Sequence, residues 1–153
     1  LMYEVGVNYP ETELEIIPGV TAATGGAAVL GAPLIHDFCL ISLSDLLTPW
    51  EKIEARLLGA SQADFVICLY NHSSKKRHDY LQKACDLMMQ YKSPETVCGT
   101  VCNIGREGEE YQVMTLKELR DRQVDMFTTV FIGNSQTKEI NGKMVTPRGY
   151  RNV

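Results

Sequence analysis

Runs of consecutive apolar residues alternate along the chain with segments in which apolar residues recur every three or four positions. The runs predict buried β-strands, because a strand that is covered on both faces has few polar positions. The recurring segments predict helices that bury one face. Strands are predicted over 37–44, 64–71, 96–103 and 128–135, with an alternating edge strand over 110–115. We therefore predict an α/β fold in which helices flank a mixed β-sheet.

Local signals place the helices between these strands. One helix is predicted to begin with Thr48 as its N-cap, Pro49 at its first position and Glu51 in a capping box, and to end at Gly59. Two further helices are predicted over 21–30 and 116–122. A third is predicted to begin with Ser73 or Ser74 as its cap, and its core stripe consists of Leu81, Ala84, Cys85 and Met88. A hairpin is predicted at Asn141-Gly142, which has short apolar flanks.

The start of the chain differs from the rest. Residues 1–6 (LMYEVG) are typical of the end of a helix, and the short apolar run over 14–19 ends in Pro-Gly. We therefore expect residues 1–13 to be the end of a preceding domain or a linker, and residues 14–153 to form one domain. The chain is then a fragment or the second half of a larger protein.

The stretch from Gly19 to Gly31 is built from glycine and alanine, with few larger side chains. Small residues at the start of a helix let a ligand approach the backbone, and the free N–H groups there give a positive potential. Small residues equally permit close packing of the helix on a sheet or on another helix. Both interpretations stay open at this point.

Composition excludes several classes of function. The net charge is −4 and the pI is about 5.4, which argues against nucleic acid as a partner. The five cysteines are odd in number and form no C-x-x-C pair, which favours buried free thiols in a reducing, cytoplasmic compartment. No apolar run approaches the length of a membrane span, and no signal peptide is visible.

Three of the predicted strands end in polar residues. The ends read Leu69 to His72, Asn103 to Arg106 and Gly133 to Ser135. Ligands of open α/β sheets bind outside the carboxyl ends of strands, so these ends predict a common binding rim. Asn, Gly and Ser also simply end strands and form turns, and the pattern supports both interpretations about equally.

Other chemistry-bearing stretches give weaker signals. The segment 105–110 (GREGEE) matches neither a phosphate-binding nor a dinucleotide-binding loop. The basic run 73–78 (SSKKRH) is typical of a solvated helix start or of an anion site. The histidines lack the spacing of metal ligands, so no metal site is predicted. No nucleophile elbow is present, and the adjacent pairs His36-Asp37 and Ser44-Asp45 are typical of loops and caps.

Five segments together resemble a known family. They read IIPGVTAATGGAAVLGAPLIHDFCLISLSDLLTPWEKIEARL, ADFVICLYNHSSKKR, NIGREGEE, TTVFIGNSQT and MVTPRGY. They are similar to the carboxyl-terminal domain of the tetrapyrrole methylases. The stretches HDF…SLSDLLTPWE and GNS…TPRGY resemble the branch of this family that methylates carbon 17 of precorrin-3B in cobalamin biosynthesis. The resemblance extends from about Leu14 to Arg151.

The resemblance implies a reaction and a cofactor. S-adenosylmethionine would donate a methyl group to carbon 17 of precorrin-3B, or of its cobalt form, and the macrocycle would contract. The cofactor would lie between two α/β domains, of which this chain resembles the second. The residues that the resemblance assigns to the cofactor are Thr21, Ala22, Leu69, Tyr70, Ile104 and Gly105, with Gly133 and Asn134 as a further wall. It singles out no acid or base for the ring contraction.

The substrate of this family is a polycarboxylate, which guanidinium groups pair with bidentately. The basic residues expected to meet it are Arg106, Arg148, Lys75, Lys76 and Arg77. The glycine-rich G-x-G-P-G and G-D-P-G loops of the family's first domain are absent from this sequence, so we expect little methyl transfer by the chain alone. The family also implies a homodimer. The alternatives are a tetrapyrrole methylase that acts at another carbon, and a non-catalytic dimerisation or tetrapyrrole-binding domain.

Overall fold

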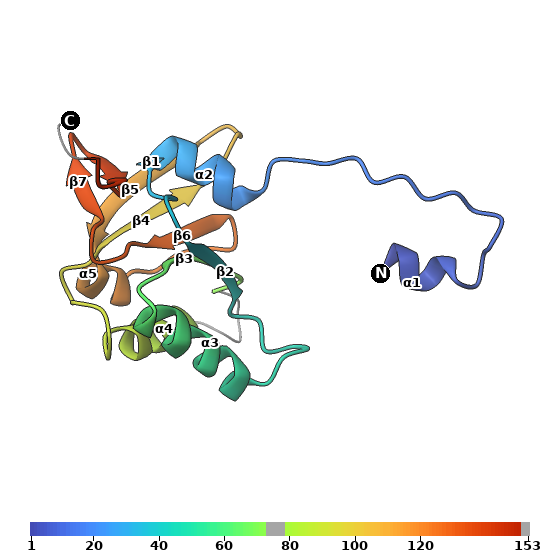
Figure 1. The fold of residues 1–153 in the computed structure, drawn as a ribbon, viewed down its shortest axis with the longest axis horizontal. Coiled ribbons are helices and arrows are strands. Elements are labelled where there is room, and N and C mark those ends of the chain that lie inside the picture. Colours follow the sequence, from blue (N-terminus) through green and yellow to red (C-terminus); the bar gives the residue numbers. More distant parts are fainter. Residues whose placement is uncertain (73–78, 151–153) are drawn as a thin grey trace.

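The computed structural model describes residues 1–72 and 79–150, so the cap predicted at Ser73 or Ser74 lies outside the described residues. The helices are α1 (Met2–Gly6), α2 (Ala22–Leu30), α3 (Trp50–Gln62), α4 (Tyr80–Met88) and α5 (Leu116–Arg120). The strands are β1 (Gly31–Ala32), β2 (Phe38–Ser42), β3 (Val66–Tyr70), β4 (Val97–Cys102), β5 (Glu110–Thr115), β6 (Thr128–Ile132), β7 (Lys138–Ile140) and β8 (Lys143–Val145). One sheet lies between α2 on one face and α3, α4 and α5 on the other (Figure 1). The predicted α/β fold with helices on both faces of a mixed sheet is confirmed.

The direction of each strand decides which loops can share a site. The five-stranded sheet has the order β2-β3-β6-β4-β5. β2 and β3 are parallel, whereas β6 runs antiparallel to both β3 and β4, and β5 runs antiparallel to β4. Therefore β2, β3 and β4 end at one edge of the sheet, where β6 begins. The carboxyl end of β6 lies at the opposite edge.

A second, three-stranded sheet has the order β1-β8-β7. Its hairpin turns at Asn141 (φ 52°) and Gly142 (φ 73°), as the sequence predicts. Both residues need a left-handed backbone here, which Asn and Gly adopt at low cost. The sequence does not predict β1, because a two-residue strand leaves no periodic pattern.

Two apolar cores fill the spaces on the two faces of the large sheet. The stripe predicted on α4, namely Leu81, Ala84, Cys85 and Met88, is buried on the α3/α5 side as expected. On the other side, small residues let α2 lie close to the sheet. A Cβ added to Gly26 would come within 2.9 Å of Ile104 Cδ1 and of Phe131 Cζ. Close packing is thus confirmed for Gly26 and for the buried Ala27, and it occurs within this domain.

Three details of the helix and strand predictions are wrong. The N-cap of α3 is Pro49, with no side-chain cap, and the helix continues through Gly59 to Gln62. Burial of Leu57 and Ser61 extends the helix past the glycine. β2, predicted to be covered on both faces, is an edge strand on which Phe38 and Leu40 are 40% and 49% exposed.

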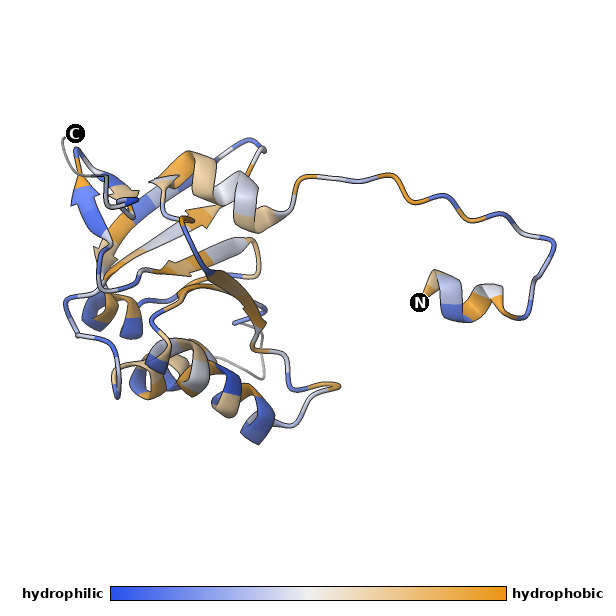
Figure 2. Ribbon diagram, viewed as in Figure 1, coloured by the Kyte–Doolittle hydropathy of each residue, from blue (hydrophilic) through white to orange (hydrophobic). Residues whose placement is uncertain are grey.

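The first twenty residues form an arm that stands apart from the rest of the molecule (Figure 1). α1 has no buried residue, turns follow it within residues 7–11, and the chain then continues without helix or strand as far as α2. Figure 2 shows apolar positions along this arm, and Ile16 and Ile17 are 70% and 83% exposed. In the described part of the chain, no helix has the length and apolar character needed to cross a bilayer.

Candidate functional site

Two strands end at the same edge of the sheet in the same way. β3 is followed by Asn71 (φ 56°) and β4 by Asn103 (φ 53°), both in the left-handed conformation that Asn tolerates better than most residues. Asn71 Nδ2 donates to Ser42 Oγ at 3.0 Å, and Asn103 Nδ2 donates to the Gly108 carbonyl at 3.3 Å. Both strands therefore turn away from the sheet at a hydrogen-bonded asparagine, and space opens above this edge.

Two adjacent hollows lie between this edge and the first turn of α2. The smaller hollow, about 240 Å³, is lined by Ala22, Tyr70, Asn71, Asn103, Ile104, Arg106 and 126–129. The larger hollow, about 490 Å³, is lined by Val20, Thr21, Ala22, Gly25, Val29, Ile104, Gly105 and Glu109. Ala22 and Ile104 belong to both. Small-molecule sites occupy roughly 300–1,000 Å³, so the larger hollow alone has the volume of a cofactor site.

The first turn of α2 forms one wall of the hollows. Thr21 is its N-cap, and its hydroxyl accepts from the Thr24 N–H at 3.4 Å. Tyr70 lies beside this turn, where the Ala23 backbone and the Thr21 side chain act to lower the pKa of its hydroxyl, less strongly than burial acts to raise it. Burial raises the pKa of the Tyr70 hydroxyl above its usual value, so the phenol is neutral at pH 7. Tyr70 thus adds a neutral polar group to the wall that the first turn of α2 forms.

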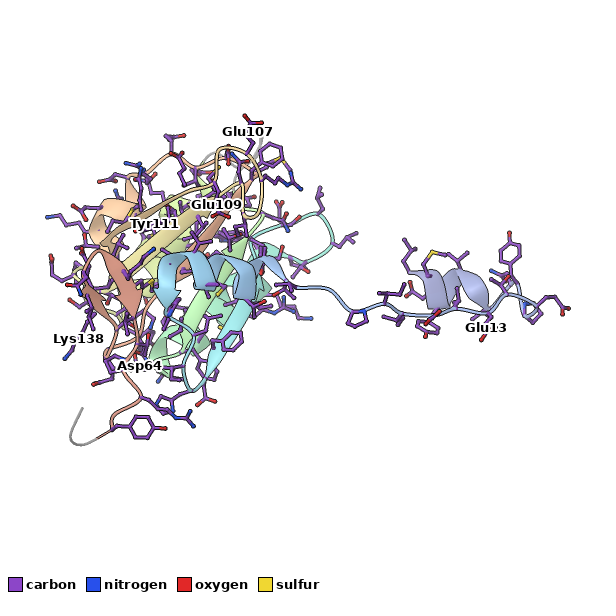
Figure 3. All side chains as sticks on the ribbon, turned by 90° about the horizontal axis from the view of Figure 1, so that it is seen from above. Glu13, Asp64, Glu107, Glu109, Tyr111 and Lys138 are labelled. Carbon is purple, nitrogen blue, oxygen red and sulfur yellow. The ribbon has the colours of Figure 1, made fainter. Side chains whose placement is uncertain are left out.

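The loop after β4 forms the opposite wall. Gly105 has a φ of 69°, and its N–H donates to Glu109 Oε2 at 2.6 Å. The Arg106 N–H donates to the Asn103 carbonyl at 2.9 Å, which closes a tight turn. A Cβ added to Gly105 would meet nothing within 4 Å, so this backbone faces open space. Figure 3 shows Glu107 and Glu109 together at this end of the domain.

A buried histidine supports the floor of the smaller hollow. His72 is 1% exposed, and its Nε2 donates to the Thr128 carbonyl at 2.8 Å, since a carbonyl oxygen only accepts. Burial lowers the pKa of His72, against weaker opposing effects of that hydrogen bond and of Asp125. His72 is therefore neutral at pH 7 and holds the first residue of β6 in place.

Most of the residues predicted for the cofactor do come together. Those that line the hollows are Thr21, Ala22, Tyr70, Ile104 and Gly105, and Arg106 stands beside them. Leu69 differs, because its side chain is fully buried in the core on the α3/α4 side of the sheet. Only the main chain of Leu69 is available to a ligand at this edge.

The prediction that Gly133 and Asn134 share this rim is wrong. β6 is antiparallel to its neighbours, so its end lies at the opposite edge of the sheet. Asn134 Oδ1 there accepts from the Gln136 N–H at 3.0 Å, and the Gly133 carbonyl accepts from the buried Lys92 Nζ at 2.9 Å. Figure 3 shows Asp64, which accepts from Ser135, at the end of the domain far from Glu107.

The other basic candidates are not assembled with Arg106. Arg148 is exposed after β8, which pairs with β1 beyond the carboxyl end of α2, whereas Arg106 lies near the amino end of α2. Lys75, Lys76 and Arg77 lie outside the described residues. Their contacts with substrate stay predictions.

Sequence reasoning misses the turn before β6. Met126, Phe127, Thr128 and Thr129 all line the smaller hollow, although the sequence pattern predicts only the start of a strand there. The available signal is an apolar pair directly after Asp125, in a loop where polar residues are usual. Within the described residues, no group of His, Cys, Asp or Glu is placed to hold a metal ion.

Comparison with known proteins gives a consistent result. A probable cobalt-factor III C(17)-methyltransferase of Salmonella typhimurium is 49% identical over 140 residues, which are 92% of this chain and 58% of that protein. A precorrin-3B C(17)-methyltransferase of Sinorhizobium sp. is 44% identical over 150 residues, 94% of this chain and 58% of that protein. The chain therefore spans somewhat more than half the length of these relatives.

Solved structures agree with the relatives. The crystal structure of the methyltransferase CobJ matches with a TM-score of 0.85 and 34% identity, over 95% of this chain and 62% of that one. A cobalt precorrin-4 methyltransferase, CbiF, has the same fold with a TM-score of 0.65 at 21% identity, over 86% of this chain and 57% of that one. The model of the family Tetrapyrrole (Corrin/Porphyrin) Methylases matches residues 1–120. With that match and these relatives, the chain belongs to the tetrapyrrole methylases.

Proposed function

We propose that this chain is the carboxyl-terminal part of an S-adenosylmethionine-dependent methyltransferase. It would methylate carbon 17 of precorrin-3B, or of its cobalt form, with ring contraction in cobalamin biosynthesis. The observation that carries this proposal is the meeting of Thr21, Ala22, Tyr70 and Ile104 around two adjacent hollows, in a chain 49% identical to a probable cobalt-factor III C(17)-methyltransferase.

The residues around the hollows fit the proposed cofactor. Ala22 is exposed, and the backbone at Gly105 faces open space, so neither wall is blocked by a side chain. Tyr70 and Ile104 offer apolar surface, which suits a nucleoside ring. When bound, S-adenosylmethionine supplies an electrophilic methyl group. The chain's own contribution is to orient the two reactants and to keep water from them.

Arg106 is suited to the substrate. It is exposed at the rim of the smaller hollow, and no carboxylate lies within 4.0 Å of it in the described part of the chain. A guanidinium without a carboxylate partner attracts carboxylates, and a precorrin carries several. Arg106 would therefore position the macrocycle relative to the methyl group. Arg148, Lys75 and Arg77 are proposed as further contacts for its acidic side chains.

The exposed arm is an argument for a second domain that precedes this one. Residues 1–13 would belong to that domain or to the linker, and residues 14–153 to the domain described above. The exposed apolar side chains of Ile16 and Ile17 lack an apolar partner here, which such a domain would provide. It would also supply the other side of the cofactor site, so the chain alone would be inactive.

Two further features concern self-association and location in the cell. The outer face of β2 exposes Phe38 and Leu40, which supports association of two copies as a homodimer. All five cysteines are free thiols, and three of them, Cys68, Cys85 and Cys98, are buried. Free thiols support a location in the reducing cytoplasm.

Methyl transfer tests the proposed function. The extended chain, defined as this chain preceded by an amino-terminal tetrapyrrole methylase domain, is incubated without oxygen with methyl-labelled S-adenosylmethionine and either precorrin-3B or cobalt-factor III. It should add one labelled methyl group, detected by mass spectrometry. Carbon NMR should place the label on carbon 17, and the shorter chain should transfer none. Label on a different carbon, or no transfer by the extended chain, would contradict the proposal.

A further inference from the structure

The turn between α5 and β6 exposes two large apolar side chains beside each other. Met126 is 69% exposed and Phe127 is 61% exposed, and both line the smaller hollow. Adjacent apolar side chains at the mouth of a hollow are a feature of binding sites rather than of ordinary surface. Neither residue has a place in the proposed function so far.

Hydrogen bonds fix the backbone of this turn, so the exposure of Phe127 does not result from a loose backbone. Asp125 Oδ1 accepts from the Phe127 N–H at 3.0 Å and from the Thr128 hydroxyl at 2.8 Å. The Phe127 carbonyl accepts from the Asn103 N–H at 3.2 Å, which ties the turn to the end of β4. The His72 ring fixes the next carbonyl, that of Thr128. The backbone therefore presents the Phe127 ring outward from a fixed base.

A positive charge lies over the ring. The Arg106 guanidinium carbon is 5.9 Å from the centre of the Phe127 ring. An arginine within about 6 Å of an aromatic face interacts favourably with it, so the cation and the ring are held as a pair. Arg106 keeps its donors free for a ligand, because no carboxylate in the described part of the chain pairs with it.

The chemistry of this pair selects between the two reactants of the proposed function. A flat apolar surface next to a guanidinium matches a conjugated ring that carries carboxylates. The cofactor also has a flat ring and one carboxylate, but its ammonium and sulfonium groups give it a net positive charge, so it fits less well beside Arg106 than a ring with several carboxylates does. Resting on the proposed function, we propose that Phe127 and Met126 form a platform under one face of the tetrapyrrole macrocycle, with Arg106 paired to one of its carboxylates.

Binding by the extended chain tests this platform. Uroporphyrin III, a stable polycarboxylate porphyrin, serves as the probe, and its fluorescence reports the Kd. Loss of the ring in Phe127→Ala should raise this Kd about tenfold, and Phe127→Tyr should bind like the wild type. The Kd for S-adenosylhomocysteine, measured by calorimetry, should change less than about twofold.

A matched control is available at the other edge of the sheet. Tyr91 is an aromatic residue of similar exposure, 53%, and it lies beside Lys92, far from the hollows. Tyr91→Ala should leave both dissociation constants unchanged. If Phe127→Ala does not fold, Met126→Ala provides the same comparison, with a smaller expected rise in the porphyrin Kd.

The outcomes separate the platform from the proposed function. Wild-type protein that binds neither porphyrin nor S-adenosylhomocysteine would contradict the proposed function itself. Wild-type protein that binds both, with Phe127→Ala and Met126→Ala indistinguishable from it, would overturn the platform alone. A weakened Kd for S-adenosylhomocysteine in Phe127→Ala, with the porphyrin Kd unchanged, would assign the ring to the cofactor and would also overturn the proposal.

Discussion

Replacing Ala22 by Phe in the extended chain is expected to weaken S-adenosylhomocysteine binding about a hundredfold or more, which corresponds to about 2.8 kcal/mol. Ala22 lines both hollows, so a phenyl ring at this position takes up space that a ligand needs there. Isothermal titration calorimetry measures the effect. The fold should be unaffected, because Ala22 is exposed in the first turn of α2 and exposed substitutions usually change stability by less than about 0.5 kcal/mol.

Ala28 provides the matched control on the same helix. It is also exposed but lines neither hollow, so Ala28→Phe should bind S-adenosylhomocysteine like the wild type. Equal affinities for Ala22→Phe and Ala28→Phe would show that the ligand does not occupy the space at the amino end of α2.

The largest effect on stability is expected at Gly133. A Cβ here would lie 2.6 Å from the Val97 carbonyl oxygen and 2.6 Å from Thr137 Cβ. The Gly133 N–H donates to that same carbonyl at 2.9 Å, so the clash also disrupts a hydrogen bond between backbone groups. Gly133→Ala should therefore lower the free energy of unfolding by about 3 kcal/mol, measured by urea denaturation of the chain.

Gly59 gives a control of opposite sign. It is an exposed residue within α3, and a Cβ added there would meet nothing within 4 Å. Gly59→Ala should stabilise the chain by about 0.5–1 kcal/mol, because alanine loses less backbone entropy in a helix. A Gly133→Ala variant as stable as the wild type would mean that the turn after β6 is looser than the structure shows.

Local signals in the sequence predict much of the fold because their causes are local. Thr21 caps a helix, and Asn141-Gly142 turns a hairpin, with the same chemistry in any protein. The apolar runs locate β2, β3, β4 and β6 for a similar reason, although β2 is largely exposed. Gly59 is wrongly predicted as a helix end, because burial beyond it on α3 outweighs the low helix propensity of glycine.

The candidate site is predictable only in part, because strand direction is a property of the whole fold. The ends of β3 and β4 share an edge, which places Tyr70, Ile104 and Gly105 together as predicted. The same reasoning fails for Gly133, since nothing near it in the sequence shows that β6 is antiparallel to both neighbours. The antiparallel direction instead brings the start of β6 to the site, and Phe127 with it.

The arrangement of the hollows also explains the low side-chain volume of α2. Gly26 lies against Ile104 and Phe131, so the helix approaches the sheet closely and Ile104 is held between the two hollows. Gly25 faces the larger hollow, where an added Cβ would lie 3.2 Å from Ile104 Cγ2. Packing and site geometry therefore depend on the same glycine pair.

We infer that this chain carries one side of a cofactor site that a preceding domain completes. Titration of S-adenosylhomocysteine into this chain and into the extended chain, followed by calorimetry, tests this inference. We expect micromolar-range binding by the extended chain, and binding at least about a hundredfold weaker by this chain alone, because it offers only one wall. Equally tight binding by both chains would contradict the shared site, and no binding by the extended chain would contradict the methyltransferase assignment.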